Sequence, residues 1–169
     1  MADRIEPKTD ELDELELPVE HFLTYRLLTL TNRLNRQAMH ILETQASLRL
    51  PEWRCLTFIH QCSGTRGKAS LHEVAEETEM DRGLVTRSVQ GLVVKGHVLT
   101  ERDGKDRRVV HAALTRQGHE LFQRMLPVMR KRQMHLLNAL SPHDRKSVYR
   151  ILDRLNTAAA DYDYENTGQ

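Results

Sequence analysis

The 169-residue chain lacks most features that mark secreted, membrane-spanning or disulfide-bonded proteins. It has only two cysteines, Cys55 and Cys62. If both lie on one helix, they are separated by about 10 Å of helical rise, too far for a disulfide within that helix. No window of about 18 apolar residues exists to span a membrane, and residues 1–17 lack the apolar core of a secretory signal. These absences predict a protein of the reducing cytoplasm with no membrane partner.

The chain also lacks the common motifs of catalysis. There is no Gly-x-Ser-x-Gly, no phosphate-binding loop, no dinucleotide fingerprint and no Cys-x-x-Cys. The nine histidines show neither His-x-x-x-His nor His-Glu-x-x-His spacing, so the sequence predicts no metal site and no cofactor. We therefore expect a protein that is not an enzyme.

Charge is unevenly distributed along a chain whose net charge is only +1. Residues 1–17 contain seven acidic and two basic side chains, and thus carry a net charge of −5. An acidic segment without aromatic residues is typical of a solvated, disordered arm. A role in binding a partner or in clasping a dimer is the alternative for this arm.

Two helical regions flank the middle of the sequence. Apolar residues recur at intervals of three and four from residue 23 to residue 48, which predicts a helix of about 30 residues ending near Pro51. After Thr115, apolar residues between 121 and 155 predict two further helices, with Pro127 expected to kink or break the first. Ser141 is expected to cap the second. Residues 18–50 and 115–164 are together predicted to form a helical dimerisation region, since they carry more apolar surface than one small domain could cover.

The middle segment, 51–114, predicts a different unit. A short helix over 52–61 is followed by the capping box Ser70 to Glu73, and Asp81 is a good cap for a helix over 82–95 that ends at Gly96. Strands are expected over 98–102 and 108–114, on either side of a turn at 103–106. Two helices joined by a tight turn and followed by a hairpin, here called the wing, form a winged helix-turn-helix. The predicted fold class is mainly α with a small β-hairpin.

The helix over 82–95 carries side chains suited to reading DNA. Arg82, Thr86 and Gln90 fall at i, i+4 and i+8 and so share one face, with Arg87 beside them. Arginine can bind guanine through two hydrogen bonds, and glutamine can bind adenine in the same way. A merely solvated helix face is the alternative for these four residues.

The wing adds a local excess of positive charge. Residues 82–108 contain seven basic and three acidic side chains, a net charge of +4, which is typical of a surface that contacts phosphates. Asp106 would repel phosphate, so we expect it to buttress an arginine. A protein-binding winged helix is an alternative, although it has no need of a basic wing tip. The predicted DNA-binding residues are Arg82, Thr86, Arg87, Gln90, Arg102, Lys105, Arg107 and Arg108.

One stretch of the chain begins at Gly96-His97-Val98, continues through Asp106-Arg107-Arg108 without a gap, and ends at Leu114-Thr115-Arg116-Gln117-Gly118. This stretch resembles the wing of the MarR family. The segment from Asp81 to Arg87 is similar to the start of that family's recognition helix. The chain departs from the family at Thr100-Glu101, where relatives often carry paired arginines, and Arg102 is the candidate substitute.

The resemblance implies a regulator of transcription, usually a repressor, that binds a pseudo-palindromic DNA operator as a homodimer. It also implies a small phenolic or carboxylate effector that releases the protein from DNA. Tyr25, Arg26 and Trp53 are the candidate effector-binding residues, because an aromatic wall with an arginine suits an aromatic acid. Plain core packing is the alternative for Tyr25 and Trp53.

Some MarR-like proteins sense oxidants through a cysteine in the first helix, where this chain has none. Redox sensing by Cys55 or Cys62 in the second helix remains an alternative hypothesis. The competing interpretation is that both cysteines are small buried residues.

Overall fold

A computed structural model describes residues 17–162; the acidic arm, apart from Leu17, and the last residues of the predicted dimerisation region lie outside this range. The described chain falls into two compact units, one up to Phe122 and the other from Gln123. A short 3-10 helix, η2 (Val19–His21), comes first. The helices are α1 (Leu23–Ala46), α2 (Leu50–Ser63), α3 (Leu71–Thr78), α4 (Arg82–Val94), α5 (Arg116–Leu137) and α6 (Pro142–Ala160), and the strands are β1 (Ala69–Ser70), β2 (Val98–Arg102) and β3 (Val110–Leu114).

The first helix is shorter than its apolar pattern predicts. α1 has 24 residues and ends at Ser47, which adopts the left-handed conformation with a φ of 51°. Leu48 lies in the short segment between α1 and α2 and is buried in the core. Pro51 occupies the first turn of α2. The predicted helix is therefore interrupted by a turn that the spacing of the leucines could not reveal.

Local capping interactions form the helix-turn-helix as expected. The Ser70 hydroxyl accepts the Glu73 backbone N–H at 3.2 Å, and the Glu73 carboxylate accepts the Ser70 backbone N–H at 2.8 Å. The Asp81 carboxylate accepts the Leu84 N–H at 2.8 Å and caps α4. The chain leaves α4 through Gly96, whose φ of 75° favours glycine.

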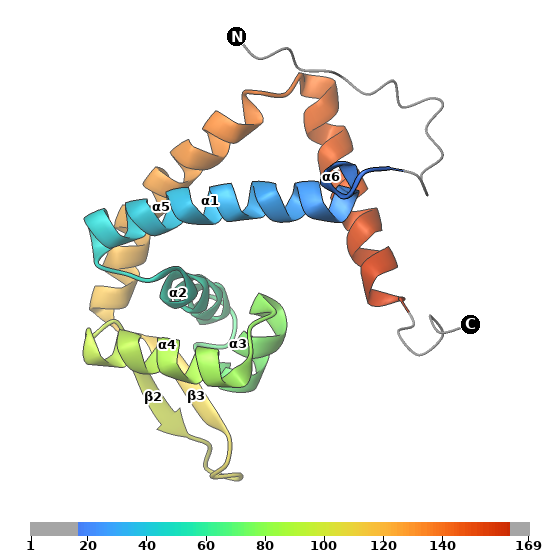
Figure 1. The fold of residues 1–169 in the computed structure, drawn as a ribbon. Coiled ribbons are helices and arrows are strands. Elements are labelled where there is room, and N and C mark those ends of the chain that lie inside the picture. Colours follow the sequence, from blue (N-terminus) through green and yellow to red (C-terminus); the bar gives the residue numbers. More distant parts are fainter. Residues whose placement is uncertain (1–16, 163–169) are drawn as a thin grey trace. The chain divides into compact units, whose positions relative to one another are not determined.

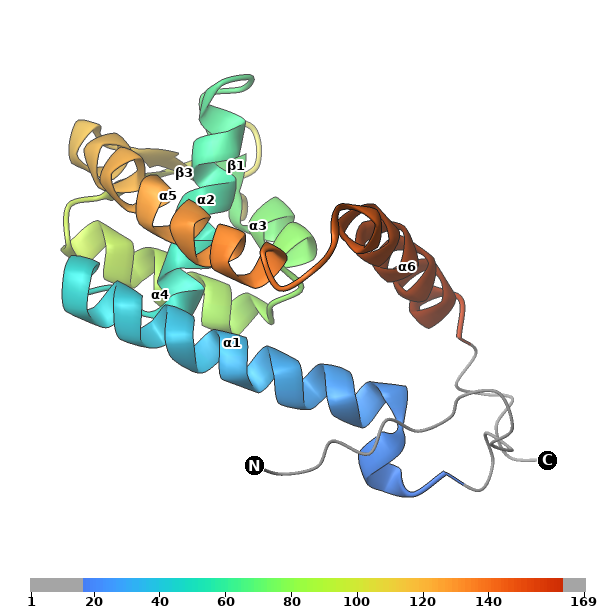
Figure 2. The ribbon, with the colours of Figure 1, turned by 90° about the horizontal axis from the view of Figure 1, so that it is seen from above.

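The wing is part of a three-stranded sheet with the order β1-β3-β2. β2 and β3 pair antiparallel, with Val98 opposite Leu114 and Arg102 opposite Val110. Both strands were expected, although β3 begins two residues later than predicted. β1 was not predicted, because a two-residue strand directly before a helix has no alternating pattern. Figure 2 shows β1 and β3 beside α2.

The core of the first unit is built around α2, which lies between α1 and α4 (Figure 1). Most of its fully buried side chains are apolar, and they come from every element of the winged helix. The largest are Leu42, Leu56, Ile59, Val74, Val85, Val89, Leu92 and Val98.

One carboxylate is buried in this core. Glu52 of α2 is 1% exposed. Its side chain accepts a hydrogen bond from the Lys95 ammonium at 2.7 Å and from the Arg49 backbone N–H at 2.7 Å. Lys95 also donates to the Ser47 carbonyl at 2.8 Å. Through these contacts one buried charge joins the end of α1, the start of α2 and the end of α4.

The surroundings of Glu52 keep it ionised. Burial raises the pKa of the Glu52 carboxyl, but the Arg49 backbone N–H and the Lys95 ammonium more than offset that effect, so its pKa lies below the ordinary value. A buried ion pair stabilises only when its partners are all present, and removing one partner typically costs about 3–5 kcal/mol.

The second unit consists of the rest of α5 and α6. α5 continues through Pro127, so of the predicted kink or break, the break is absent. The Ser141 hydroxyl accepts the Asp144 N–H and caps α6 as expected. Arg145 then donates to the Leu137 carbonyl at 2.8 Å and ties α6 to α5. Among residues 17–162, no helix combines the length and apolar character needed to cross a membrane.

Gly91 of α4 provides a test of the buried ion pair. A Cβ atom at this position would lie 2.4 Å from the Glu52 Oε1 atom. Alanine in a helix interior normally stabilises by about 1 kcal/mol relative to glycine, but here we expect Gly91→Ala to lower the free energy of unfolding by about 1–3 kcal/mol through overpacking. Chemical denaturation measures the change.

The matched control is Gly83→Ala in the same helix. Its Cβ would lie 3.1 Å from the Oδ1 atom of Asp81, which caps α4, and 3.2 Å from the Arg87 guanidinium, and both side chains are exposed and can yield by a few tenths of an ångström. We expect a change within about 0.5 kcal/mol. Equal stabilisation by both substitutions would show that Glu52 does not constrain the approach of α2 to α4.

Candidate DNA-binding surface

The recognition helix α4 has two distinct faces. Val85, Val89 and Leu92 are buried against the core, whereas the predicted base-reading residues lie on the opposite, exposed face. The Thr86 hydroxyl donates to the Arg82 carbonyl at 2.8 Å, which leaves its oxygen and methyl group exposed. The exposed polar side chains are Arg82, Thr86, Arg87 and Gln90.

A histidine from α3 contacts the first residue of this helix. The Nδ1 atom of His72 lies 3.3 Å from Nη2 of Arg82, and the Nε2 atom of His72 lies 3.2 Å from the Glu76 carboxylate. Sequence reasoning missed this contact because it joins two helices ten residues apart. The short turn between α3 and α4 was the only available indication that they would meet.

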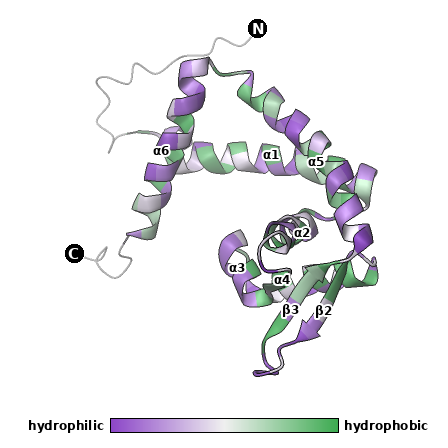
Figure 3. Cartoon of the chain, turned by 180° about the vertical axis from the view of Figure 1, so that it is seen from behind, coloured by the Kyte–Doolittle hydropathy of each residue, from purple (hydrophilic) through white to green (hydrophobic). Residues whose placement is uncertain are grey.

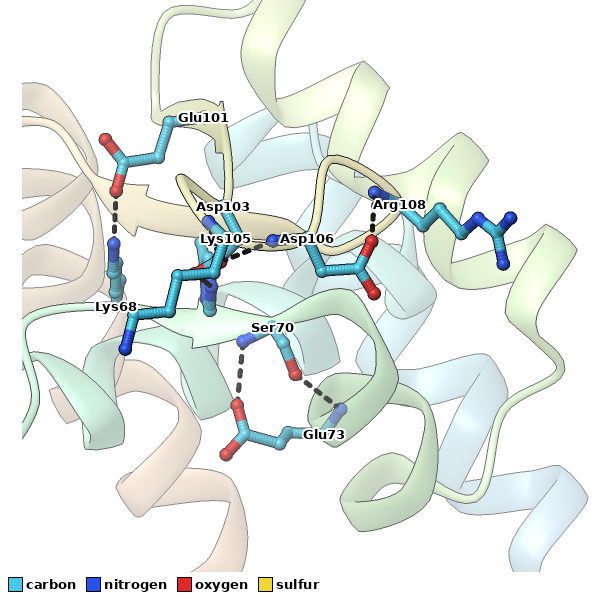
Figure 4. A network of polar contacts seen from close by, with 9 residues as sticks. Lys68, Ser70, Glu73, Glu101, Asp103, Lys105, Asp106 and Arg108 are labelled. Atoms are coloured by element: carbon cyan, nitrogen blue, oxygen red, sulfur yellow. Dashed lines mark hydrogen bonds and ion pairs between the residues drawn. The ribbon is translucent and has the colours of Figure 1, made fainter.

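Asp103 makes most of the hydrogen bonds that organise the wing tip. One carboxylate oxygen of Asp103 accepts the backbone N–H groups of Lys105 and Asp106 at 2.8 and 3.0 Å, and the other lies 3.1 Å from Nε2 of His111 (Figure 4). These hydrogen bonds lower the pKa of Asp103 to about 2, the two backbone N–H donors contributing most. Sequence reasoning assigned no role to Asp103, although aspartate commonly accepts backbone N–H groups at the start of a turn.

Asp106 contacts an arginine, but it binds the backbone of Arg108 and not the guanidinium. Its carboxylate accepts the Arg108 backbone N–H at 2.9 Å (Figure 4). Arg102 donates from its guanidinium to the Arg107 carbonyl at 3.2 Å, and so supports the same turn from β2. The Lys105, Arg107 and Arg108 side chains remain exposed. The wing therefore presents three cationic side chains on a backbone held by two aspartates.

The acidic residue in the first wing strand is neutralised within the sheet. Glu101 of β2 forms an ion pair with Lys68, which precedes β1 (Figure 4). The hydrogen bond from Lys68 lowers the pKa of the Glu101 carboxyl. The departure at Thr100-Glu101 thus removes cationic side chains from this strand without adding an unpaired negative charge.

The recognition helix and the wing border a shared groove of about 330 Å³. Arg82 and Thr86 line it from α4, and Arg108 lines it from the base of the wing. His72 and Leu71 complete it from α3. Two of the predicted DNA-binding arginines, from segments 26 residues apart in sequence, therefore face one concave surface.

Comparison with known proteins agrees with this geometry. The MarR family model matches residues 47–109, which contain both helices of the helix-turn-helix and the tip of the wing. The winged helix segment is therefore similar to the MarR family. The expected family and the expected fold class are thereby confirmed.

Individual relatives of this MarR-family segment are distant. The uncharacterized HTH-type transcriptional regulator YkoM of Bacillus subtilis (strain 168) is 29% identical over 90 residues, which are 53% of this chain and 58% of YkoM. The chain thus spans less than two thirds of that relative's length. The family and this relative are regulators of transcription and not enzymes, as the absence of catalytic motifs predicts.

Two solved structures of proteins that bind DNA show the same fold. Sco3205 from Streptomyces coelicolor, solved in complex with DNA, matches with a TM-score of 0.73 at 24% identity, over 89% of this chain and 96% of the other. BpsR from Bordetella bronchiseptica, whose DNA binding is regulated by 6-hydroxynicotinic acid, matches with a TM-score of 0.63 at 21% identity, over 78% and 98% of the two chains.

The three predicted effector-binding residues do not share a pocket. Trp53 is buried, stacks on Phe122 with ring centroids 5.7 Å apart, and borders a pocket of about 380 Å³ next to α3. Tyr25 and Arg26 are exposed on the first turns of α1 and line a separate hollow with Arg33. Tyr25 and Arg26 lie at the start of α1 and Trp53 lies beyond its end, so most of the length of α1 separates the two sites.

Neither cysteine is exposed. Cys55 is fully buried, and burial raises the pKa of its thiol to about 12. Cys62 is 4% exposed, and its sulfur accepts a hydrogen bond from Arg66 at 3.4 Å. Oxidants react with exposed thiolates, so the geometry gives no support to redox sensing by Cys55.

The Asp103 carboxylate makes the order of the wing depend on pH. Its pKa of about 2 is lower than the ordinary value of 3.8, so its stabilising effect is complete above about pH 4 and is lost as pH falls towards 2. We expect Asp103→Asn to speed hydrogen exchange of the Lys105 and Asp106 amides several-fold at neutral pH. Amide exchange measured by NMR tests this.

Asp106→Asn is the matched control, because Asp106 accepts only the Arg108 N–H and does not bind these two amides. We expect it to leave the exchange of the Lys105 amide unchanged. If both variants protect that amide as well as the wild type does, Asp103 does not organise the turn.

Proposed function

We propose that this chain is a regulator of transcription that binds double-stranded DNA selectively through α4 and the wing. The single observation that carries the proposal is that Arg82 and Thr86 of α4 and Arg108 of the wing are exposed around one groove. An α-helix fits the major groove, where each base pair presents a distinct pattern of donors and acceptors. Placement of the protein beside the chromosome, in the cytoplasm, is part of the proposal.

The exposed residues divide into two roles. Thr86, Arg87 and Gln90 of α4 read base edges, and an arginine bound to guanine contributes about 1–3 kcal/mol of discrimination. Arg107 and Arg108 contact the backbone or the minor groove beside the recognition helix, assisted by Lys105. Arg102 acts on DNA indirectly, since its guanidinium supports the turn through the Arg107 carbonyl.

The proposed regulator is a homodimer on a pseudo-palindromic operator, with half-sites about one helical turn apart. Its support is the number of large apolar side chains that stay exposed along α1 and along α6. Figure 3 shows hydrophobic residues in green on both helices. Such surface is typical of a protein interface. The exposed residues are Leu23, Tyr25, Leu28, Leu30 and Met39 on α1, and Tyr149, Ile151 and Leu152 on α6.

We expect Ile151→Glu to weaken dimerisation at least tenfold, because it would bury an unpaired charge in the interface. Lys146→Glu is the control, since Lys146 lies on a different face of α6 and is exposed. Sedimentation equilibrium at micromolar concentration measures both. A wild-type chain that sediments as a monomer would contradict the proposed dimer.

The proposal includes a small aromatic-acid effector that releases the repressor from DNA. The pocket bordered by Trp53 and Arg54 and the hollow bordered by Tyr25 and Arg26 each combine aromatic surface with a guanidinium. A suitable probe is 6-hydroxynicotinic acid, the compound that regulates DNA binding by BpsR. If Arg26→Ala and Arg54→Ala both respond to it as the wild type does, neither site is the effector site.

Arg108→Ala tests the DNA-binding function. We expect the variant to bind all duplexes more weakly and to reduce the slope of log affinity against log salt by about one, as loss of one phosphate contact requires. Fluorescence anisotropy on random and selected duplexes at several salt concentrations measures this.

Arg130→Ala is the matched control, because Arg130 is an exposed arginine of α5 outside the winged helix. It should bind with wild-type affinity and slope. Absence of selective binding by the wild type, with all three proteins alike, would favour a winged helix that contacts proteins instead.

A further inference from the structure

In the hydrogen bond between His72 of α3 and Arg82, the first residue of α4, the donor and the acceptor can be assigned. Arginine is protonated at all accessible pH values and has only donors, so the Nδ1 atom of His72 must accept from Nη2 of Arg82 across their 3.3 Å. His72 then carries its proton on Nε2, which faces the Glu76 carboxylate at 3.2 Å. One neutral tautomer satisfies both contacts, and Glu76, His72 and Arg82 form a chain of hydrogen bonds.

This chain restricts the guanidinium of Arg82. An unrestrained arginine side chain loses considerable rotamer freedom when it binds, and prior positioning reduces that loss. Nη2 of Arg82 uses one N–H on His72, which leaves four of the five donors free. Arg82 is also the first residue of α4, where recognition helices contact base edges, and it lines the groove shared with Thr86 and Arg108.

We propose that His72 is a positioning residue that sets the base preference of Arg82, holding its guanidinium for two hydrogen bonds to a guanine. The sequence read by the protein then depends on a side chain outside the recognition helix. Glu76 supports this arrangement by fixing the tautomer of His72. The inference rests on the proposed DNA-binding function and adds a specificity determinant to it.

Two amide substitutions separate the contacts of His72. In His72→Asn, the side-chain oxygen lies as many bonds from Cβ as Nδ1 does, so the acceptor for Arg82 is kept. In His72→Gln, the amide nitrogen corresponds to Nε2, so the donor to Glu76 is kept, while the amide oxygen lies one bond farther from Cβ than Nδ1 does and no longer occupies the acceptor position for Arg82. The His72 and Glu76 side chains are more than half exposed, so both variants should unfold at the wild-type temperature.

The experiment selects binding sites from randomised duplexes with the full-length wild type, His72→Asn, His72→Gln and Arg82→Ala. We expect Arg82→Ala to abolish the guanine preference at one position of each half-site. His72→Gln should reduce the preference at that same position about fivefold, and His72→Asn should retain it. In Arg82→Ala, adding His72→Gln should change nothing further, because the two residues act as a unit.

The outcomes are distinguishable. If the wild type selects no sequence, the proposed function fails and this inference fails with it. If the wild type is selective but His72→Gln keeps its preference, or if both amide variants lose it equally, His72 does not position Arg82. A uniform loss of affinity with a shallower salt slope would assign Arg82 to a phosphate and overturn the inference.

Discussion

The winged helix depends on one buried carboxylate. Glu52 accepts from Lys95 at the end of α4 and from the Arg49 backbone at the start of α2, while Lys95 also binds the carbonyl of Ser47. Such a charge is tolerated in a core only when every partner is present. The requirement fixes the end of the recognition helix relative to α1 and α2, and Gly91 allows the close approach.

Anchoring α4 at its end leaves its beginning available for recognition. The buried valines and Leu92 pack one face of α4 against the core, and Asp81 caps its first turn. Neither interaction involves the exposed polar face. The wing follows the same division, since Asp103 fixes the backbone through N–H groups while the cationic side chains stay exposed. Residues that hold the fold and residues proposed to contact DNA are therefore largely different, and substitutions can separate stability from binding.

Arg82 and Arg102 are exceptions to that division. Both are exposed cations in the proposed DNA-binding surface, yet each also makes a hydrogen bond within the protein, to His72 and to the Arg107 carbonyl. An arginine restrained in this way exchanges conformational freedom for geometric selectivity. The polar contacts around the groove are thus part of the recognition surface as well as of its support.

The sequence by itself determined the elements whose causes are local. Ser70 with Glu73, Asp81 and Gly96 fix helix ends through contacts within a few residues, and the spacing of Val85, Val89 and Leu92 fixes the buried face of α4. The tertiary structure decided what depends on distant partners. Ser47 ends α1 early, Glu52 pairs in the core with Lys95 from 43 residues farther along the chain, and His72 meets Arg82 across a turn. A linear pattern records which face of an element is apolar, whereas the pairing of polar groups depends on how elements meet, and only the folded chain sets that.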